Sequence, residues 1–197
     1  TGTAVAHCPI SNLKRGLIAS VPEMLKRGIR VGLGTDYPNN DLFNVMRGTS
    51  LIHTVKDDDH KGVSAQQSFE LATQGGADAL GIGENVGSIH IGKKADIITL
   101  ETAENTRLFP LNTETVINLI RINGAGCDVS DVIVDGTLLM KDRHLLHLDE
   151  EKILCNGKRC QETFHEKYED MRANGVPFVK TRMPELLYLA PSYKPTR

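Results

Sequence analysis

The sequence has 197 residues, of which 40% are hydrophobic and 24% are charged, and its formal net charge at pH 7 is −2. This is the composition of an ordinary globular protein, and with no block of basic residues it gives no reason to expect nucleic acid or a membrane surface as a partner. No apolar run approaches the roughly 20 residues that a membrane-spanning helix needs.

The first 35 residues predict a strand, a loop, a helix and a second strand. Residues 3–7 and 29–33 are short apolar runs that predict buried strands, and Pro9–Asn12 favours a turn. Val21–Arg27 predicts a helix, because Pro22 suits its first turn and a glycine follows it. This order is typical of a βαβ unit with a parallel pair of strands.

Three further helices are predicted before residue 81, at residues 42–53, 65–73 and 77–80. Gly48 weakens the first of these predictions, and Gly75-Gly76 is expected to end the second helix. The polar segment at residues 57–62 predicts a loop. Residues 1–81 are therefore expected to form one domain.

From Gly81 onward the pattern changes to β-structure, with strands expected within residues 87–100, 116–122, 131–140 and 143–147. Val134-Asp-Gly-Thr137 is typical of a hairpin turn. These strands predict a small β domain at residues 82–148. A polar helix, interrupted at Gly157, is expected within residues 149–175, and the proline-containing residues 176–197 predict an extended tail.

The first residues and the cysteines predict the context of the chain. The sequence opens at Thr1 and passes directly into an apolar run, so we expect further residues upstream. The four cysteines form no CxxC pair, which favours reduced thiols in a cytoplasmic protein.

Asp36 directly follows the second predicted strand. Functional residues of α/β folds gather at the carboxyl ends of parallel strands. A carboxylate there can bind a metal ion or act as a general base. Gly32 and Gly34 leave room for close approach of the backbone. The alternative is that Asp36 only caps or turns the chain.

His7 ends the first predicted strand, so it should open on the same edge as Asp36. Its imidazole can bind substrate, orient a partner or ligate a metal, or it can simply fix the loop. Ser11 and Asn12 in that loop are candidates for the pocket lining, although both residue types also favour turns. The remaining histidines, His53 among them, receive no functional role.

Three groups of residues resemble the amidohydrolase superfamily, in the branch of aminohydrolases and chlorohydrolases that holds guanine, adenosylhomocysteine and methylthioadenosine deaminases and triazine hydrolases. His7–Lys14 is similar to the loop after the seventh barrel strand of that family. Val31–Asp36, with Asn39–Phe43 and Met46-Arg47 after it, is similar to the eighth strand and its helix. The return into the small β domain is matched by three segments: Glu70–Gly81, Gly87–Ile98 and Val132–Gly136.

The resemblance implies an α/β fold, made of the last strands and helices of a (β/α)8 barrel and part of a small β-sandwich domain. It implies a divalent metal, zinc in preference to iron, that activates a water. Asp36 matches the aspartate that ligates this metal and accepts a proton from the attacking water. His7, Ser11 and Asn12 would then bind a small nitrogen heterocycle that loses an amino or chloro group.

The departure from the family is as informative as the match. The family also needs a His-x-His pair after its first strand and histidines after its fifth and sixth, and this chain lacks those positions. We therefore expect the chain alone to be inactive, and to need a missing N-terminal barrel segment or a partner chain. A homo-oligomer is also expected. The alternative hypothesis is a non-catalytic interaction or structural protein that retains part of the fold.

Overall fold

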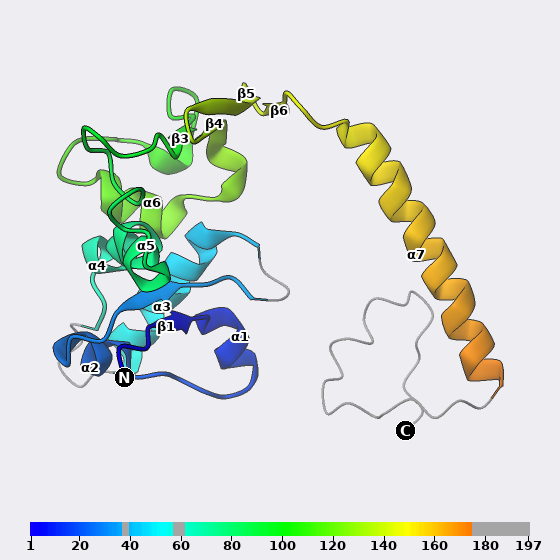
Figure 1. The fold of residues 1–197 in the computed structure, drawn as a ribbon, viewed down its shortest axis with the longest axis horizontal. Coiled ribbons are helices and arrows are strands. Elements are labelled where there is room, and N and C mark those ends of the chain that lie inside the picture. The colour runs from blue at the N-terminus through cyan, green and yellow to red at the C-terminus, as the bar shows by residue number, and fades with distance from the viewer. Residues whose placement is uncertain (37–39, 57–61, 175–197) are drawn as a thin grey trace. The chain divides into compact units, whose positions relative to one another are not determined.

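The computed structural model describes residues 1–36, 40–56 and 62–174 (Figure 1). Apart from Gly62, the predicted polar loop at residues 57–62 lies outside these residues, as does the predicted tail at residues 176–197. The chain divides into two compact units, Thr1–His147 and Leu148–Arg197.

The first unit begins with the predicted βαβ arrangement. β1 (Val5–His7) and β2 (Val31–Leu33) pair in parallel, with Val5 opposite Val31 and His7 opposite Leu33. Between them in the sequence lie α1 (Pro9–Lys14) and α2 (Val21–Lys26). The predicted parallel pair and the predicted helix at α2 are thus confirmed.

The predicted turn at Pro9–Asn12 was wrong, because this segment opens α1. Pro9 occupies the first helical position, where its missing N–H costs no hydrogen bond. The backbone N–H of Asn12 donates to the carbonyl of Cys8 at 3.0 Å, which closes the first helical turn.

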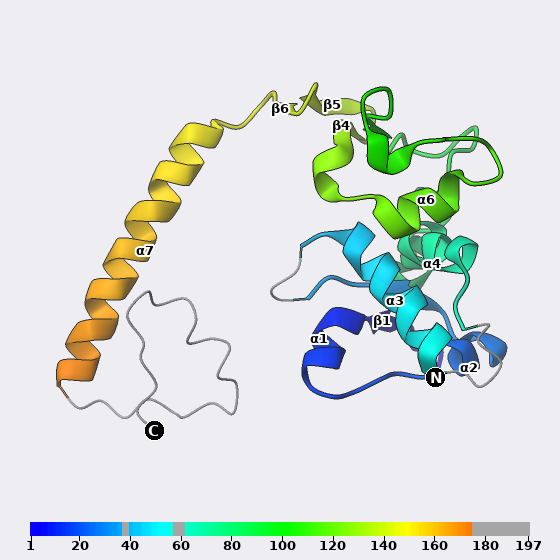
Figure 2. The same cartoon turned by 180° about the vertical axis from the view of Figure 1, so that it is seen from behind.

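Three helices follow β2, namely α3 (Leu42–Lys56), α4 (Ala65–Ala72) and α5 (Gln74–Leu80). α4 begins with a capping box, in which Ser64 and Gln67 bond to each other's backbone N–H groups. In the view from behind, α3 lies beside α4 and α6 (Figure 2). The core is centred on four buried side chains, Val21, Val31, Val63 and Leu71.

Gly75 and Gly76 lie inside α5 and do not end a helix, contrary to the prediction. The reason is the close packing of α5 on β2. A Cβ atom on Gly32 would lie 2.8 Å from the Cα of Gly76, and a Cβ on Gly75 would lie 3.1 Å from the carbonyl oxygen of Val31. The low helix propensity of Gly75 and Gly76 is outweighed by the close contact between α5 and β2, which only glycine permits.

The segment after α5 is fixed to this helix by Lys93. Its ammonium group donates to Oε1 of Gln74 (2.8 Å), Oγ of Ser88 (2.9 Å), and the carbonyl oxygens of Gly83 (2.5 Å) and Val86 (3.1 Å). These bonds hold a stretch of turns in place. Of the strand predicted within residues 87–100, only the last four residues are extended.

A four-stranded antiparallel sheet completes the first unit. Its order is β3 (Ile97–Leu100), β4 (Val129–Val134), β5 (Thr137–Lys141) and β6 (His144–Leu145). The predicted hairpin is confirmed, since Val134 pairs with Thr137. Asp135 and Gly136 both have positive φ, 49° and 78°, as a tight two-residue hairpin turn requires.

The strand predicted at residues 116–122 was wrong, since this segment is α6 (Val116–Asn123), which lies between two 3-10 turns (Thr106–Leu108 and Gly126–Asp128). Asn112 fixes the turn that leads into the helix, because its side-chain oxygen accepts the N–H groups of Glu114 (3.0 Å) and Thr115 (2.9 Å). After α6 the chain passes so close to α3 that a Cβ on Gly124 would lie 3.0 Å from the ring of Phe43. This turn and this packing outweigh the β-propensity of the isoleucines and the valine.

The described part of the second unit is α7 (Glu150–Ala173). Asp149 caps it by accepting the N–H of Lys152 at 2.9 Å. The helix runs through Gly157, so the predicted interruption was wrong. No helix among the described residues has the length and apolar character needed to cross a membrane.

We predict that Gly32→Ala destabilises the chain, because the new Cβ would meet backbone on α5 that cannot move aside. The expected loss in the free energy of unfolding is about 1–3 kcal/mol, typical of overpacking. Urea denaturation of the full chain measures it. The matched control is Gly126→Ala, whose Cβ would meet nothing nearer than 3.8 Å. Equal urea midpoints for the two variants would contradict the close-packing argument.

Candidate active site

The carboxyl ends of β1 and β2 lie side by side. The backbone N–H of Gly34 donates to the carbonyl of His7 at 2.9 Å, extending the parallel pair by one bond. Asp36 follows two residues later, exposed and with a φ of 50°. This edge is therefore where the loops that follow both strands begin.

The side chain of Cys8, directly after β1, packs against the segment that follows β2. A Cβ on Gly34 would lie 2.9 Å from the sulfur of Cys8, so this sulfur covers the glycine. Burial raises the pKa of the Cys8 thiol, and the negative charge of Asp36 raises it further. The Asp36 carboxylate is thus close enough to the end of β1 to act on it electrostatically.

His7 points away from the exposed face of the strand pair. Side chains alternate along a strand, and Ala6 is exposed while His7 is only 2% exposed. The His7 ring packs against the ring of His53 on α3, with centroids 5.8 Å apart and planes tilted by 43°. Within the described residues, neither ring nitrogen of His7 has a hydrogen-bond partner.

The environment of His7 favours its neutral form. Desolvation by burial is the larger cause and the charge of His53 the second, and together they lower its pKa from 6.5 to about 4. A neutral imidazole can donate one hydrogen bond and accept another, so this buried ring keeps its capacity to bind a polar atom.

Ser11 and Asn12 lie on α1, Ser11 buried and Asn12 half-buried. α1 is seated on α3 through Ile10, because a Cβ on Gly48 would lie 2.7 Å from the end of the Ile10 side chain. The missing side chain of Gly48 therefore leaves room on α3 for Ile10 of α1. The structure brings β1 with His7, and α1 with Ser11 and Asn12, to the edge of the strand pair where Asp36 follows β2.

Two residues of the resembling motif after β2 connect α3 to the chain beyond α6. Asp41 accepts the N–H of Phe43 at 2.9 Å and the N–H of Gly126 at 3.1 Å. Arg47 donates to the carbonyls of Ile122 (2.6 Å) and Gly124 (2.8 Å). These bonds give Asp41 and Arg47 a structural role in holding the helix that follows Asp36.

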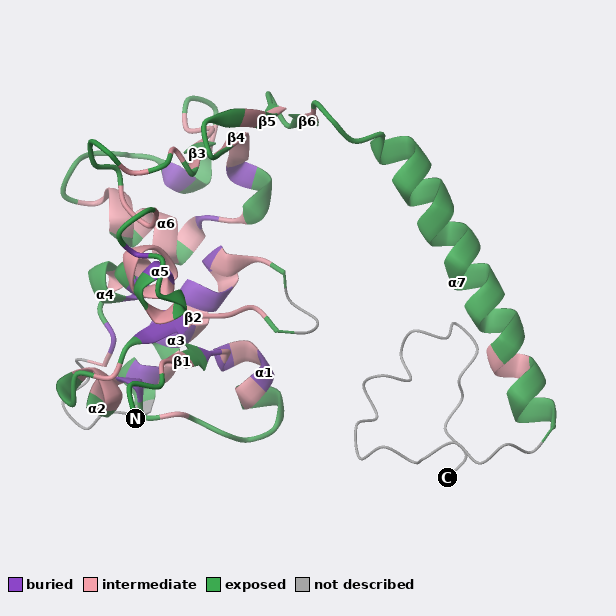
Figure 3. Cartoon of the chain, viewed as in Figure 1, coloured by how far each residue is buried: buried purple, intermediate pink, exposed green. Residues whose placement is uncertain are grey.

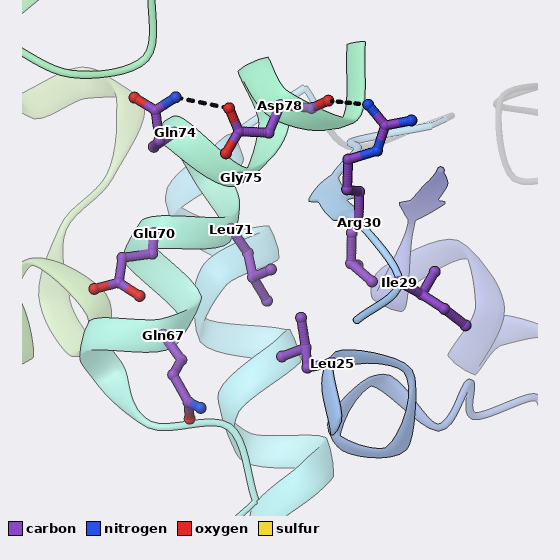
Figure 4. Close-up of a pocket in the computed structure, with 10 residues that line it drawn as sticks. Leu25, Ile29, Arg30, Gln67, Glu70, Leu71, Gln74, Gly75 and Asp78 are labelled. Carbon is purple, nitrogen blue, oxygen red and sulfur yellow. Dashed lines mark hydrogen bonds between the residues drawn. The ribbon is translucent and has the colours of Figure 1, made fainter. Parts of the chain in front are cut away.

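A hollow of about 430 Å³ lies at the opposite end of β2 (Figure 4). Leu25, Ile29 and Leu71 contribute apolar side chains to its wall. Three of its polar residues are bonded together, since Arg30 donates to the carbonyl of Asp78 at 3.1 Å and Gln74 donates to the carboxylate of Asp78 at 2.8 Å. Because functional groups of parallel folds gather at the other end of the strands, we assign the hollow no catalytic role.

The described residues do not form a complete metal site. Within residues 1–36, 40–56 and 62–174, no three His, Cys, Asp or Glu side chains come together in a way that could hold a metal ion. A catalytic zinc takes three protein ligands as a rule. Asp36 can supply one ligand, so any metal bound here needs further ligands from elsewhere.

Residues 1–139 match the sequence profile of the Amidohydrolase family. The chain belongs to this family. Over 162 residues this amidohydrolase chain is 41% identical to a 5-methylthioadenosine/S-adenosylhomocysteine deaminase of Acetivibrio thermocellus, a match that covers 80% of the chain and 37% of that relative. The chain thus spans little more than a third of the length of this relative.

Two solved amidohydrolase-like structures resemble the fold. An adenosine deaminase from Xanthomonas campestris with bound zinc matches with a TM-score of 0.77 and 25% identity, covering 83% of this chain and 38% of that one. An atrazine chlorohydrolase from Arthrobacter aurescens complexed with zinc matches with a TM-score of 0.70 and 29% identity, covering 80% and 36%. Both of these structures contain bound zinc.

Sequence reasoning missed His53, although its spacing carried a signal. Within the helix predicted at residues 42–53, Val45, Thr49 and His53 follow one another at intervals of four residues and so lie on one face. All three are fully buried. His53 is the last residue of the helix predicted at residues 42–53, so following this row to the end of that helix would have placed His53 in the core.

We predict that protonation of His7 weakens the fold. Because its pKa is lowered from 6.5 to about 4, the unfolded chain binds this proton more tightly than the folded chain. The stabilisation is complete above pH 6.5 and is lost as pH falls towards 4, by an amount on the order of 3 kcal/mol. Urea denaturation at both pH values, for wild type and for His7→Phe, measures the difference.

The variant should lose less stability on acidification than the wild type, because it has no proton to gain at this position. An NMR titration of the His7 ring provides a second measurement of the same pKa. An equal fall in stability for the two proteins, or a His7 ring that titrates near 6.5, would contradict the assignment.

Proposed function

We propose that this chain is the C-terminal part of a metal-dependent hydrolase that removes an amino or chloro group from a nitrogen heterocycle by attack of water. The observation that carries the proposal is the position of Asp36, exposed at the carboxyl end of the second parallel strand in a chain of the amidohydrolase family. Deaminase and chlorohydrolase relatives support the reaction class.

In this proposal Asp36 is one ligand of a divalent metal and accepts a proton from the attacking water. Zinc is favoured over iron, since two similar structures contain zinc. A bound zinc supplies a water whose pKa is lowered to near 7, and hence a nucleophile at neutral pH. Asp36 is exposed, so its side chain is accessible from solvent.

The proposed substrate-binding residues are His7, Ser11 and Asn12. Asn12 is half-buried, and its amide can donate to and accept from the ring nitrogens of a heterocycle. His7 and Ser11 are buried in this chain. They would contact the substrate directly only if it reached past the strand ends. Otherwise they would act on substrate binding by holding α1, which bears Asn12, in position.

The proposed complete protein has the rest of a (β/α)8 barrel and of a β-sandwich, supplied by an N-terminal segment or a partner chain. Those parts would bring the remaining metal ligands, so we propose that the chain alone is inactive. The domain boundaries at residues 81, 148 and 175 belong to this proposal, as does a cytoplasmic location. Cys8, Cys127, Cys155 and Cys160 are all free thiols, in keeping with a reducing compartment.

A second candidate is a non-catalytic interaction or structural protein that keeps part of the fold. It is favoured by the absence, among the described residues, of a three-ligand cluster. The two candidates differ in metal content and in turnover. Stoichiometric zinc or iron with ammonia release would exclude the second candidate.

We predict that Asp36→Asn lowers hydrolytic activity at least about a hundredfold, because loss of the carboxylate removes a proton acceptor and a metal ligand together. The protein is produced as its gene encodes it, with whatever precedes Thr1. Ammonia or chloride release is measured on methylthioadenosine, S-adenosylhomocysteine, adenosine, guanine and atrazine, and the metal content is measured in parallel.

The matched control is Asp142→Asn. Asp142 has a φ of 48°, close to the 50° of Asp36, so the two variants share any effect of backbone conformation. Asp142 lies between β5 and β6, away from the parallel strands, and its variant should retain full activity. Wild-type activity in Asp36→Asn, or a wild type with neither bound metal nor turnover, would defeat the proposal.

A further inference from the structure

Burial falls along the segment that follows β2, from buried Gly32 through half-buried Gly34 to exposed Asp36 (Figure 3). Gly34 thus lies at the boundary between the packed strand and the proposed metal ligand. The backbone N–H of Gly34 donates to the carbonyl of His7 at 2.9 Å, so the end of β1 lies directly beside this boundary. The residue after His7 is Cys8, whose side chain reaches Gly34.

The residue type of Cys8 is not explained by its position at the start of α1. Cys8 directly precedes the first helical residue, where Ser, Thr, Asp and Asn are preferred because their side-chain oxygen accepts a backbone N–H. The side chain of Cys8 makes no such bond. Its sulfur packs on Gly34, since a Cβ on Gly34 would lie 2.9 Å from this sulfur.

The residue type of Gly34 is not explained by its backbone conformation. Its φ lies outside the left-handed range that glycine adopts more readily than other residues. Among the described residues, and apart from its neighbours in the chain, only the sulfur of Cys8 lies within 4 Å of where a Cβ on Gly34 would be. The missing side chain therefore makes room for one group, the Cys8 thiol, and each of these two residue types accounts for the other.

The contact between Cys8 and Gly34 lies between two residues of the proposed site. The backbone N–H of Asn12, a proposed substrate-binding residue, donates to the carbonyl of Cys8 at 3.0 Å, so Cys8 begins the helical turn that holds Asn12. On the other side of the contact, Asp36 follows Gly34 by two residues. The sulfur of Cys8 thus lies between the turn that bears Asn12 and the segment that bears Asp36.

We propose that Cys8 is a positioning residue, whose sulfur, packed on Gly34, sets the place of Asp36 relative to Asn12. This inference rests on the function proposed above, in which Asp36 binds a metal and Asn12 binds the substrate. Catalysis of this kind depends on the relative placement of the reacting groups, and a misplacement of about 1 Å can cost on the order of a hundredfold in rate. The thiol takes no chemical part, so another group that fills the same space can replace it.

An exchange of side chains across the contact tests the proposal. The variants are Gly34→Ala, Cys8→Ala and the double variant, each in the protein produced as its gene encodes it. Gly34→Ala places a methyl group against the sulfur, and Cys8→Ala leaves a gap. In the double variant the new methyl group enters the space that the sulfur leaves, so the two changes in volume nearly compensate.

Two quantities are measured on each protein. They are the zinc dissociation constant, by competition with a chromophoric chelator, and kcat for ammonia or chloride release at saturating zinc. Gly34→Ala should weaken zinc binding by about tenfold or more, as happens when a group that orients a metal ligand is lost, and should lower kcat by a similar factor. The double variant should return both quantities to within about threefold of wild type, because the two substitutions are coupled.

Urea denaturation separates positioning from a merely structural role. A structural contact would lower the urea midpoint of Gly34→Ala but leave the zinc affinity and kcat of the folded protein unchanged. Gly157→Ala combined with Cys160→Ala is the matched control and should bind zinc as wild type does. Both of these residues are exposed on α7, and a Cβ on Gly157 would meet no described atom within 4 Å.

If Gly34→Ala does not fold, the comparison of Cys8→Ala with the double variant carries the test, since the double variant should bind zinc more tightly. Its recovery also excludes thiol chemistry, because it has no thiol at this position. Losses that add in the double variant, a double variant that does not fold, or wild-type zinc affinity and kcat in both single variants would overturn the role of Cys8 alone. A wild type without bound zinc or turnover would refute the proposed function, and this inference with it.

Discussion

The direct packing of α5 on β2 is the contact on which the rest of the first unit depends. Gly32 on the strand meets Gly76 on the helix, and a Cβ on Gly32 would come within 2.8 Å of the Cα of Gly76. Gly75 on the same helix lies against the carbonyl of Val31, so no side chain separates the helix from the strand. β1 takes its place by pairing with β2, so the position of both strands depends on this glycine contact.

The ends of the strands divide the candidate site into two environments. Asp36 is exposed, so its carboxylate can stay charged and reach a cation. His7 lies on the helix side of the same sheet, against His53, where burial keeps the imidazole neutral. A carboxylate and a neutral imidazole near the ends of adjoining strands are the groups that the proposed hydrolysis of a polar ring would use.

The sequence was sufficient where a local rule agreed with the final packing. The parallel strands, the place of Asp36 after the second of them, and the Asp135-Gly136 hairpin follow from apolar periodicity and turn chemistry. It was insufficient where distant residues decide the outcome. Residues 116–123 are helical because of the turn that Asn112 fixes before them and the packing near α3, and neither can be read from β-branched composition. The further ligands that Asp36 would need in the proposed metal site likewise lie outside any local pattern.

α7 differs from the first unit in how its folding is supported. A single helix is at best marginally stable in water, because the entropy lost on ordering each residue is hardly offset by its own hydrogen bonds. Its cap at Asp149 contributes about 1 kcal/mol, while Gly157 costs about as much. These local terms cancel, so a 24-residue helix with no buried side chain depends for its stability on contacts beyond its own turns.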